Sequence, residues 1–177
     1  LYLIDRNGEN VNNSPIILPC NTKVGHSLFD YNNNRKYRIL IVGEDNNIYN
    51  LNKRGGGIKG WKYEKNSNRI NKKLQYFRIG TKDYILAERN NSNTQLLAIN
   101  GSERVRFEKN ILFNGNPISI DENGTLYNIT SEGKLWRGNL DGSSSQLTLS
   151  DLANNSLFAI DETGKEKQFI FTNNNKV

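Results

Sequence analysis

One short motif recurs along this chain and constrains its fold more than any other feature. It reads apolar, aromatic, any residue, apolar, then Asp, Asn or Thr, two polar residues and Gly. Four clear copies occupy residues 1–8, 48–55, 126–133 and 157–164, and a degenerate copy occupies residues 96–103. An apolar run that ends in polar residues and Gly is typical of a β-strand entering a tight turn. Its repetition predicts a repeat architecture of consecutive hairpins.

The spacing of the copies indicates the size of the repeat. Their turn positions are separated by 47, 48, 30 and 31 residues, at Gly8, Gly55, Glu103, Gly133 and Gly164. The first two steps match the roughly 40–50 residues of a four-stranded propeller blade. In the two shorter steps, either a hairpin is missing or the motif falls on a different hairpin of the blade; the sequence leaves both open.

We therefore predict an all-β fold of consecutive antiparallel sheets, arranged as a partial propeller-like array of about four blades. Residues 1–177 form a single region in this interpretation. Its approximate repeats are 1–26, 27–74, 75–112, 113–155 and an incomplete 156–177.

The composition agrees with a fold rich in turns. The mean hydropathy is −0.72, but the apolar residues are grouped in short runs rather than dispersed as in a disordered chain. The 30 Asn suit tight turns, because Asn tolerates left-handed backbone and forms Asx turns. No apolar run approaches the ~18 residues of a membrane span. The absence of Met and a start inside the motif indicate a fragment of a longer protein, cut within its repeats.

Several landmarks between Phe29 and Arg106 carry a family resemblance. They are the segments 29–33, 57–63, 76–85 and 104–106. In this order they resemble the C-terminal β-propeller-like region of large uncharacterised cell-envelope proteins of Bacteroidetes. The strand–turn unit is also similar to the blades of WD40, PQQ and YWTD propellers. The resemblance implies a propeller-like fold and a periplasmic or cell-envelope location, and it carries over no catalytic residues.

The residues that usually perform chemistry are scarce. Cys20 and His26 are single, which excludes an intrachain disulfide, a His-pair metal site and most Cys-rich metal sites. Asp30, Asn32 and Asn34 have the alternation of a Ca²⁺ loop, but one carboxylate followed by two cations favours a plain Asx turn. The adjacent acids at 121–122 and 161–162 fall in turns and do not form a hydrolytic pair. We predict no catalytic residue, no cofactor and no metal site.

The middle of the chain is basic. Residues 53–109 contain fourteen Lys or Arg and five Asp or Glu, a net charge of +9, whereas the whole chain carries +6. Aromatic residues alternate with these cations, and the candidate binding residues of the segment are Trp61, Tyr63 and Arg78; outside it, Trp136 is a candidate for stacking on a sugar. Cations beside rings can bind single-stranded nucleic acid. Alternation along a strand instead buries the rings and leaves the Lys side chains in water, and this interpretation is favoured.

These patterns predict a non-enzymatic binding or scaffold module of a bacterial envelope protein, with a protein or glycan as partner. Two alternatives remain open. One is a part of a propeller enzyme whose active site lies outside this fragment. The other is polyanion or nucleic-acid binding through residues 53–109, which the packing interpretation disfavours. The open sheet edges of an incomplete propeller would also permit self-association.

Overall fold

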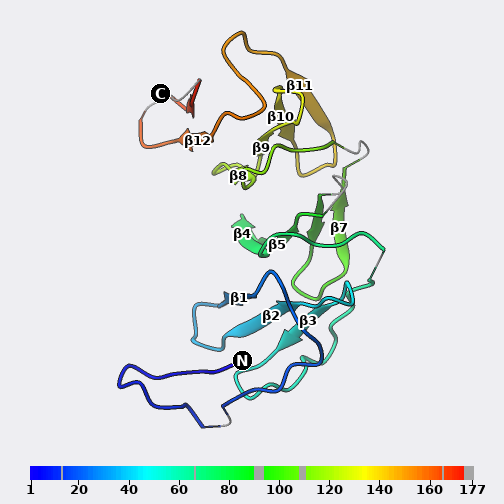
Figure 1. Cartoon of the computed structure of the whole chain (residues 1–177), viewed down its shortest axis with the longest axis vertical. Coiled ribbons are helices and arrows are strands. Elements are labelled where there is room, and N and C mark those ends of the chain that lie inside the picture. Colours follow the sequence, from blue (N-terminus) through cyan, green and yellow to red (C-terminus); the bar gives the residue numbers. More distant parts are fainter. Residues whose placement is uncertain (13, 66, 90–93, 108–110, 165, 174–177) are drawn as a thin grey trace. The chain divides into compact units, whose positions relative to one another are not determined.

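The computed structural model describes residues 1–12, 14–65, 67–89, 94–107, 111–164 and 166–173 of the chain. These residues are built from β-strands and turns, without a helix that could cross a membrane. The strands, labelled in Figure 1, are β1 (His26–Phe29), β2 (Arg38–Val42), β3 (Ile48–Leu51), β4 (Gln75–Ile79), β5 (Lys82–Ala87), β6 (Gln95–Leu97), β7 (Glu103–Arg106), β8 (Ser119–Ile120), β9 (Leu126–Ile129), β10 (Leu135–Gly138), β11 (Ser144–Leu147), β12 (Phe158–Asp161) and β13 (Gln168–Phe171).

Each sheet is a meander of strands that follow one another in the sequence. The strand orders are β1-β2-β3, β4-β5-β6-β7, β11-β10-β9-β8 and β12-β13. The strand pairs with a defined register are antiparallel, as between β2 and β3, where Ile39 lies opposite Leu51. None of the sheets closes on itself. The prediction of an all-β fold with consecutive antiparallel sheets is therefore confirmed.

The same hydrogen-bonded turn occurs at seven places in the described part of the chain. The N–H of its first residue donates to the carbonyl four residues on, and its carbonyl accepts from the N–H three residues on, at 2.8 to 3.1 Å. The fourth residue always has a positive φ, between 66° and 90°. This is a type I turn followed by a left-handed residue, which explains the recurrent Gly. The turns begin at Asp5, Gly43, Asn52, Ala98, Asp121, Thr130 and Asn139.

The degenerate copy of the motif is displaced by two residues from its predicted alignment. The turn begins at Ala98, so Gly101, with a φ of 86°, takes the place that the sequence analysis gave to Glu103. Glu103 instead begins β7. The corrected copy spans 94–101, and the conformational demand for Gly at the fourth turn position gives the reason. The first copy, at residues 1–8, forms the turn and a bridge between Ile4 and Asn10, but not a named strand.

The chain divides into two compact units. Unit 1 contains Leu1–Phe77, Asp83–Asn90 and Gln95–Arg104, and unit 2 contains the remaining segments. In unit 1 both faces of the β1-β2-β3 sheet are covered. Successive residues of β2 belong alternately to two hydrophobic clusters. Leu40 and Val42 lie in one cluster, which also contains Ile85 and Leu97. On the opposite face, Ile39 and Ile41 pack with Ile16 and Leu51. The period-2 alternation of a strand explains why four consecutive β2 residues are buried.

In unit 2, the sheet that contains β9 and β10 also has buried side chains on both of its faces. Tyr127, Ile129 and Leu135 form a cluster with Leu152, and residues of β12 and β13 pack against it. On the alternate side of β10, Trp136 contacts the rings of Phe107 and Phe113 edge-on, with centroids 5.2 and 5.0 Å away.

Candidate functional site

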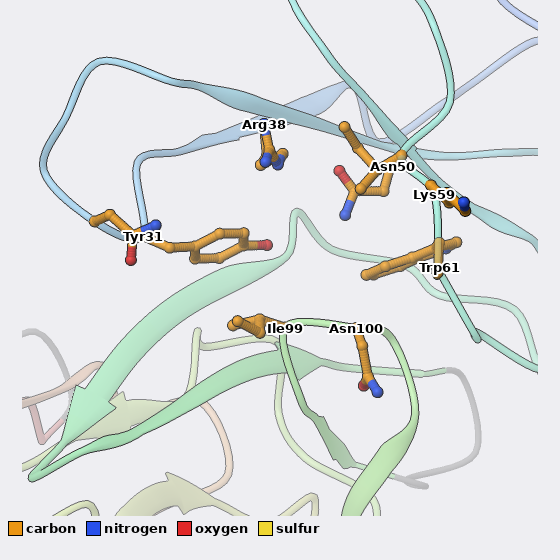
Figure 2. Close-up of a pocket in the computed structure, with 10 residues that line it drawn as sticks. Tyr31, Arg38, Asn50, Lys59, Trp61, Ile99 and Asn100 are labelled. Carbon is orange, nitrogen blue, oxygen red and sulfur yellow. The ribbon is translucent and has the colours of Figure 1, made fainter.

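A small pocket lies in unit 1, beside the β1-β2-β3 sheet. Its volume is about 220 Å³, below the ~300–1,000 Å³ that is usual for larger organic ligands. Its walls come from the turn after β1, the strands β2 and β3, the segment 58–61 and the turn after β6. Figure 2 shows Tyr31, Arg38, Asn50 and Trp61 around the same space. A pocket of this size suits one small ring with its substituents.

Strand register brings Arg38 and Asn50 to the same wall of the pocket. Leu40 lies opposite Asn50 in the β2–β3 pair, and Arg38 is two residues from Leu40 along β2. Side chains two apart on a strand share a face, so Arg38 and Asn50 are diagonal neighbours on one side of the sheet. This face is apolar further along, where Val42 and Ile48 enter the core. The pocket therefore begins where the inward face of the sheet changes from apolar to polar.

The amide of Asn50 is the most unusual group of the pocket. The residue is only 4% exposed, and its Oδ1 is buried without a hydrogen-bond donor among the described residues. Figure 2 shows the amide projecting into the space between Arg38 and Trp61. Leaving a buried amide oxygen unpaired costs about 1–3 kcal/mol. A ligand in the pocket that donates a hydrogen bond to this oxygen would remove that cost. The unpaired amide is therefore the feature of the pocket that points to a ligand site.

Arg38 supplies the positive charge of this wall. The guanidinium is half-buried and makes no hydrogen bond or ion pair with any residue that the structure describes. Lys59 also lines the pocket, and none of the lining residues is acidic. A guanidinium offers five donors in a planar fork that matches a carboxylate.

Tyr31 adds a neutral donor next to Arg38. Its ring is fixed by contacts with Phe29 and Tyr76, with centroids 6.0 and 5.1 Å away. Burial raises the pKa of the Tyr31 hydroxyl well above its ordinary value, although the charge of Arg38 acts in the opposite direction. The hydroxyl is therefore protonated at every physiological pH and remains a hydrogen-bond donor. In Figure 2 it points across the pocket towards Trp61.

Trp61 forms the opposite end of the pocket and is held rigidly. Its Nε1–H donates to the carbonyl of Ile48 at 2.7 Å. Gly101 packs against the ring: a Cβ built on Gly101 would lie 2.9 Å from the ring atoms Cδ2 and Cε2. The neighbouring Asn100 uses its Oδ1 to accept from Ser102 N–H, at 3.1 Å, within the turn. The turn after β6 therefore fixes Trp61 from one side, and the ring borders the pocket.

The four residues singled out in the sequence have different environments. Trp61 lines the pocket. Tyr63 belongs to an internal network, because its hydroxyl accepts from Arg89 Nη2 at 2.7 Å and its ring lies under the guanidinium. Trp136 is 1% exposed and offers no accessible face for a sugar, so it is not part of the candidate site. Arg78 is exposed on β4 and does not line the pocket.

Several cations of the basic segment 53–109 are engaged within the protein. Arg69 lies 3.9 Å from Glu44, and Lys72 donates to Glu88 at 2.8 Å. Arg89 is 4% exposed and its Nη atoms are used internally. Arg104 stacks on Tyr84, 5.3 Å from the ring centroid. Four of the fourteen cations of the segment are therefore engaged in ion pairs, internal hydrogen bonds or a ring contact.

In the turn after β1, the Asp30 carboxylate is used by the backbone of the loop. Oδ1 of Asp30 accepts from the N–H of Asn34 at 3.1 Å, and Oδ2 accepts from the N–H of Arg35 at 2.7 Å. Both carboxylate oxygens thus stabilise the loop, although the donors lie four and five residues on and not two residues on as in an Asx turn. Within the described ranges, no three His, Cys, Asp or Glu side chains are grouped as a metal site would need.

Comparison with protein-family models and with curated proteins found no match to this sequence. The assignment of the site therefore rests on its geometry and chemistry.

Sequence reasoning found Trp61 but missed Tyr31, Arg38 and Asn50. These three residues lie on different strands or turns, and only the register of β1, β2 and β3 brings them together. One signal was available. Asn50 stands between Tyr49 and Leu51 in a motif strand, at a position whose alternation with Ile48 points inward. An Asn predicted to face inward needs a partner, and a ligand is one candidate for that partner.

Proposed function

We propose that this chain is a non-catalytic binding module and that the pocket of unit 1 is its ligand site, with a glycan as the partner. The observation that carries the proposal is the buried Asn50 amide, whose oxygen lacks a donor among the described residues and which faces a pocket between a cation and a Trp ring. Rings of this kind stack on the C–H faces of sugars, and amides bind hydroxyl groups.

The propeller-like arrangement and the envelope location are parts of the same proposal. The support for the arrangement is that each sheet is a meander of consecutive strands, as in a propeller blade. The support for the location is the resemblance of the segments between Phe29 and Arg106 to envelope proteins. An envelope module that binds glycans would meet its ligands at the cell surface.

Titration with simple sugars tests the binding proposal. The full chain is titrated with glucose, N-acetylglucosamine and glucuronate, and Trp fluorescence is recorded. Trp136 is buried in unit 2, so a change in emission reports mainly on Trp61. We expect at least one of the three sugars to change the emission with saturation, and we expect Asn50→Leu to abolish the change. If none of the sugars alters the fluorescence of the folded protein, the proposal is wrong.

A further inference from the structure

The charges around the pocket restrict the ligand further than its shape does. Two cationic side chains, Arg38 and Lys59, line it, and no acidic side chain does. Arg38 lacks a counter-ion among the described residues, and the protonated Tyr31 hydroxyl lies on the same side. A half-buried guanidinium without a carboxylate partner is stabilised most by a ligand that supplies one. The Arg38 end of the pocket therefore matches an anionic group.

The Trp61 end favours a different part of the ligand. The face of an aromatic ring is electron-rich, so it attracts polarised C–H groups and repels an anion. Figure 2 places Arg38 and Trp61 on different sides of the Asn50 amide. A ligand that satisfies both ends carries its negative charge at one edge and an apolar ring face at the other. The Asn50 amide lies between them, where it can bind a ring hydroxyl.

The size of the pocket selects among anionic ligands. About 220 Å³ accommodates one ring with a carboxylate, but not a nucleotide with base, sugar and phosphate together. Single-stranded nucleic acid would also need a track of cations leading away from the stacked base. Three cations of the basic segment, Arg69, Lys72 and Arg104, are engaged with Glu44, Glu88 and Tyr84 and are not available for such a track.

We infer that the pocket binds an acidic sugar residue of the uronic acid class, with the carboxylate at Arg38 and Tyr31, a hydroxyl at Asn50 and a ring face on Trp61. This inference rests on the proposed function and adds the chemical class of its ligand. The recognition is non-covalent, and it is expected to weaken with salt, since part of it is a charge-assisted hydrogen bond at a half-buried cation.

The test compares glucuronate with glucose, which differ at the carboxylate, by Trp61 fluorescence at about 0.1 M salt. We expect the full chain to bind glucuronate at least about tenfold more tightly than glucose, as one charge-assisted hydrogen bond provides. Arg38→Gln should weaken glucuronate binding by a similar factor, so that the variant no longer prefers glucuronate to glucose. Arg54→Gln is the matched control, because Arg54 is exposed, carries the same charge and does not line the pocket.

The outcomes separate this inference from the proposed function. Equal affinities for glucose and glucuronate, or an Arg38→Gln variant that binds glucuronate normally, would overturn the acidic class while leaving a sugar site in place. Failure of both sugars to bind would overturn both. A titration with oligothymidylate completes the set. Tight binding of oligothymidylate, weakened by Arg38→Gln and accompanied by no response to glucuronate, would replace the sugar with nucleic acid.

Discussion

Asn50 and Asn128 occupy the same position in two copies of the repeated motif, yet their amides have opposite hydrogen-bonding states. Asn128 is fully buried; its Nδ2 donates to the Asn116 carbonyl at 3.1 Å and its Oδ1 accepts from Ile129 N–H at 2.8 Å. Asn50 is 4% exposed, and its side chain makes no hydrogen bond within the described part of the chain. In the copy at 126–133 the Asn side chain stabilises the fold through hydrogen bonds. In the copy at 48–55 the Asn side chain faces a pocket instead.

This difference predicts opposite effects for one substitution. Asn50→Leu should leave the free energy of unfolding unchanged or raise it, because an apolar side chain of similar shape removes an unpaired buried amide. Asn128→Leu should lower the free energy of unfolding by about 2 kcal/mol, because it breaks the hydrogen bonds to the Asn116 carbonyl and the Ile129 N–H. Urea denaturation of both variants measures the two changes. An equal loss of stability in the two variants would show that Asn50 has a structural partner.

A second prediction concerns Gly101 and the ring that it supports. Gly101→Ala should lower both stability and sugar affinity. The new Cβ would lie 2.9 Å from Trp61, and the residue has a φ of 86°, which L side chains adopt at a cost of about 1 kcal/mol or more. The Trp61 ring must then move towards the pocket. Thermal unfolding and the glucuronate titration measure the two losses.

Gly8→Ala is the control for the backbone part of this effect. Gly8 has a φ of 85° at the same turn position, but nothing lies within 4 Å of a Cβ built there. The stability difference between the two alanine variants therefore reports the contacts of the new Cβ with the Trp61 ring and with the Tyr63 backbone N, which also lies 2.9 Å away. Similar losses in both, with normal glucuronate binding by Gly101→Ala, would contradict the role of Gly101 in placing the ring.

Most of the strand–turn organisation could be predicted from the sequence, because each turn is formed by residues that are adjacent in the chain. The left-handed fourth position of the turn favours Gly or Asn. A Gly or Asn at this place after an apolar run therefore indicates a hairpin turn. The strands at the start of the motif were equally predictable: the copies at 48–55 and 126–133 begin with β3 and β9. β11 (Ser144–Leu147) contains no copy of the motif and could not be predicted in this way, since a largely exposed strand at the edge of its sheet has no apolar face. Its partner β10 supplies the pairing that the sequence of β11 does not indicate.

The site was less readable, because it depends on contacts between distant segments. Trp61 and Trp136 look alike in the sequence, because each directly precedes a cationic residue, Lys62 and Arg137 respectively. Their environments differ because β10 is covered on both sides, with Leu135 in one cluster and Trp136 against two Phe rings. Trp61 instead borders a pocket whose other wall, Arg38 and Asn50, comes from the register of β2 and β3. The register between two strands depends on how both of them pack, so it cannot be predicted from the sequence of either strand alone.

The third prediction assigns Tyr63 to stability rather than to binding. Its hydroxyl accepts from Arg89 Nη2 at 2.7 Å, and Arg89 also donates to Gln95 Oε1 at 2.9 Å and to the Asn68 carbonyl at 2.6 Å. Tyr63→Phe removes one acceptor from a buried cation, so it should lower the free energy of unfolding by about 2 kcal/mol. The affinity for glucuronate should not change. Tyr37→Phe, at an exposed Tyr, is the control and should alter neither quantity.

The last prediction concerns a buried ion pair in unit 2. Asp121 is 3% exposed and accepts hydrogen bonds from Lys167, from Thr125 N–H at 2.7 Å and from Asn123 N–H at 3.0 Å. Burial alone would raise the pKa of Asp121, but these donors outweigh it and hold the pKa below its ordinary 3.8. The hydrogen bond to Asp121 also raises the pKa of Lys167 above 10.5.

These shifts set the sign of the pH dependence. Because the pKa of Asp121 is depressed in the folded protein, the unfolded chain takes up the proton first as the pH falls. The contribution of the pair to stability is therefore present above about pH 5 and is lost as the pH falls through the folded pKa. At the alkaline end, the raised pKa of Lys167 means that its contribution is lost only as the pH rises through that folded value, above 10.5.

Lys167→Met tests this pair directly. At pH 7 the variant should be less stable than the parent chain by on the order of 2 kcal/mol, because a buried carboxylate loses its charged donor. The difference should shrink as the pH falls below about 4 and should be lost once the pH is below the depressed folded pKa of Asp121, where Asp121 is protonated in both proteins. Lys134→Met is the matched control: Lys134 donates to Glu132 at 2.8 Å, but both side chains are largely in water, and little change is expected at any pH. A stability difference for Lys167→Met that stays constant from pH 7 to pH 2 would indicate that Lys167 acts through packing on Tyr127, 5.5 Å from the ring centroid, and not through the charge of Asp121.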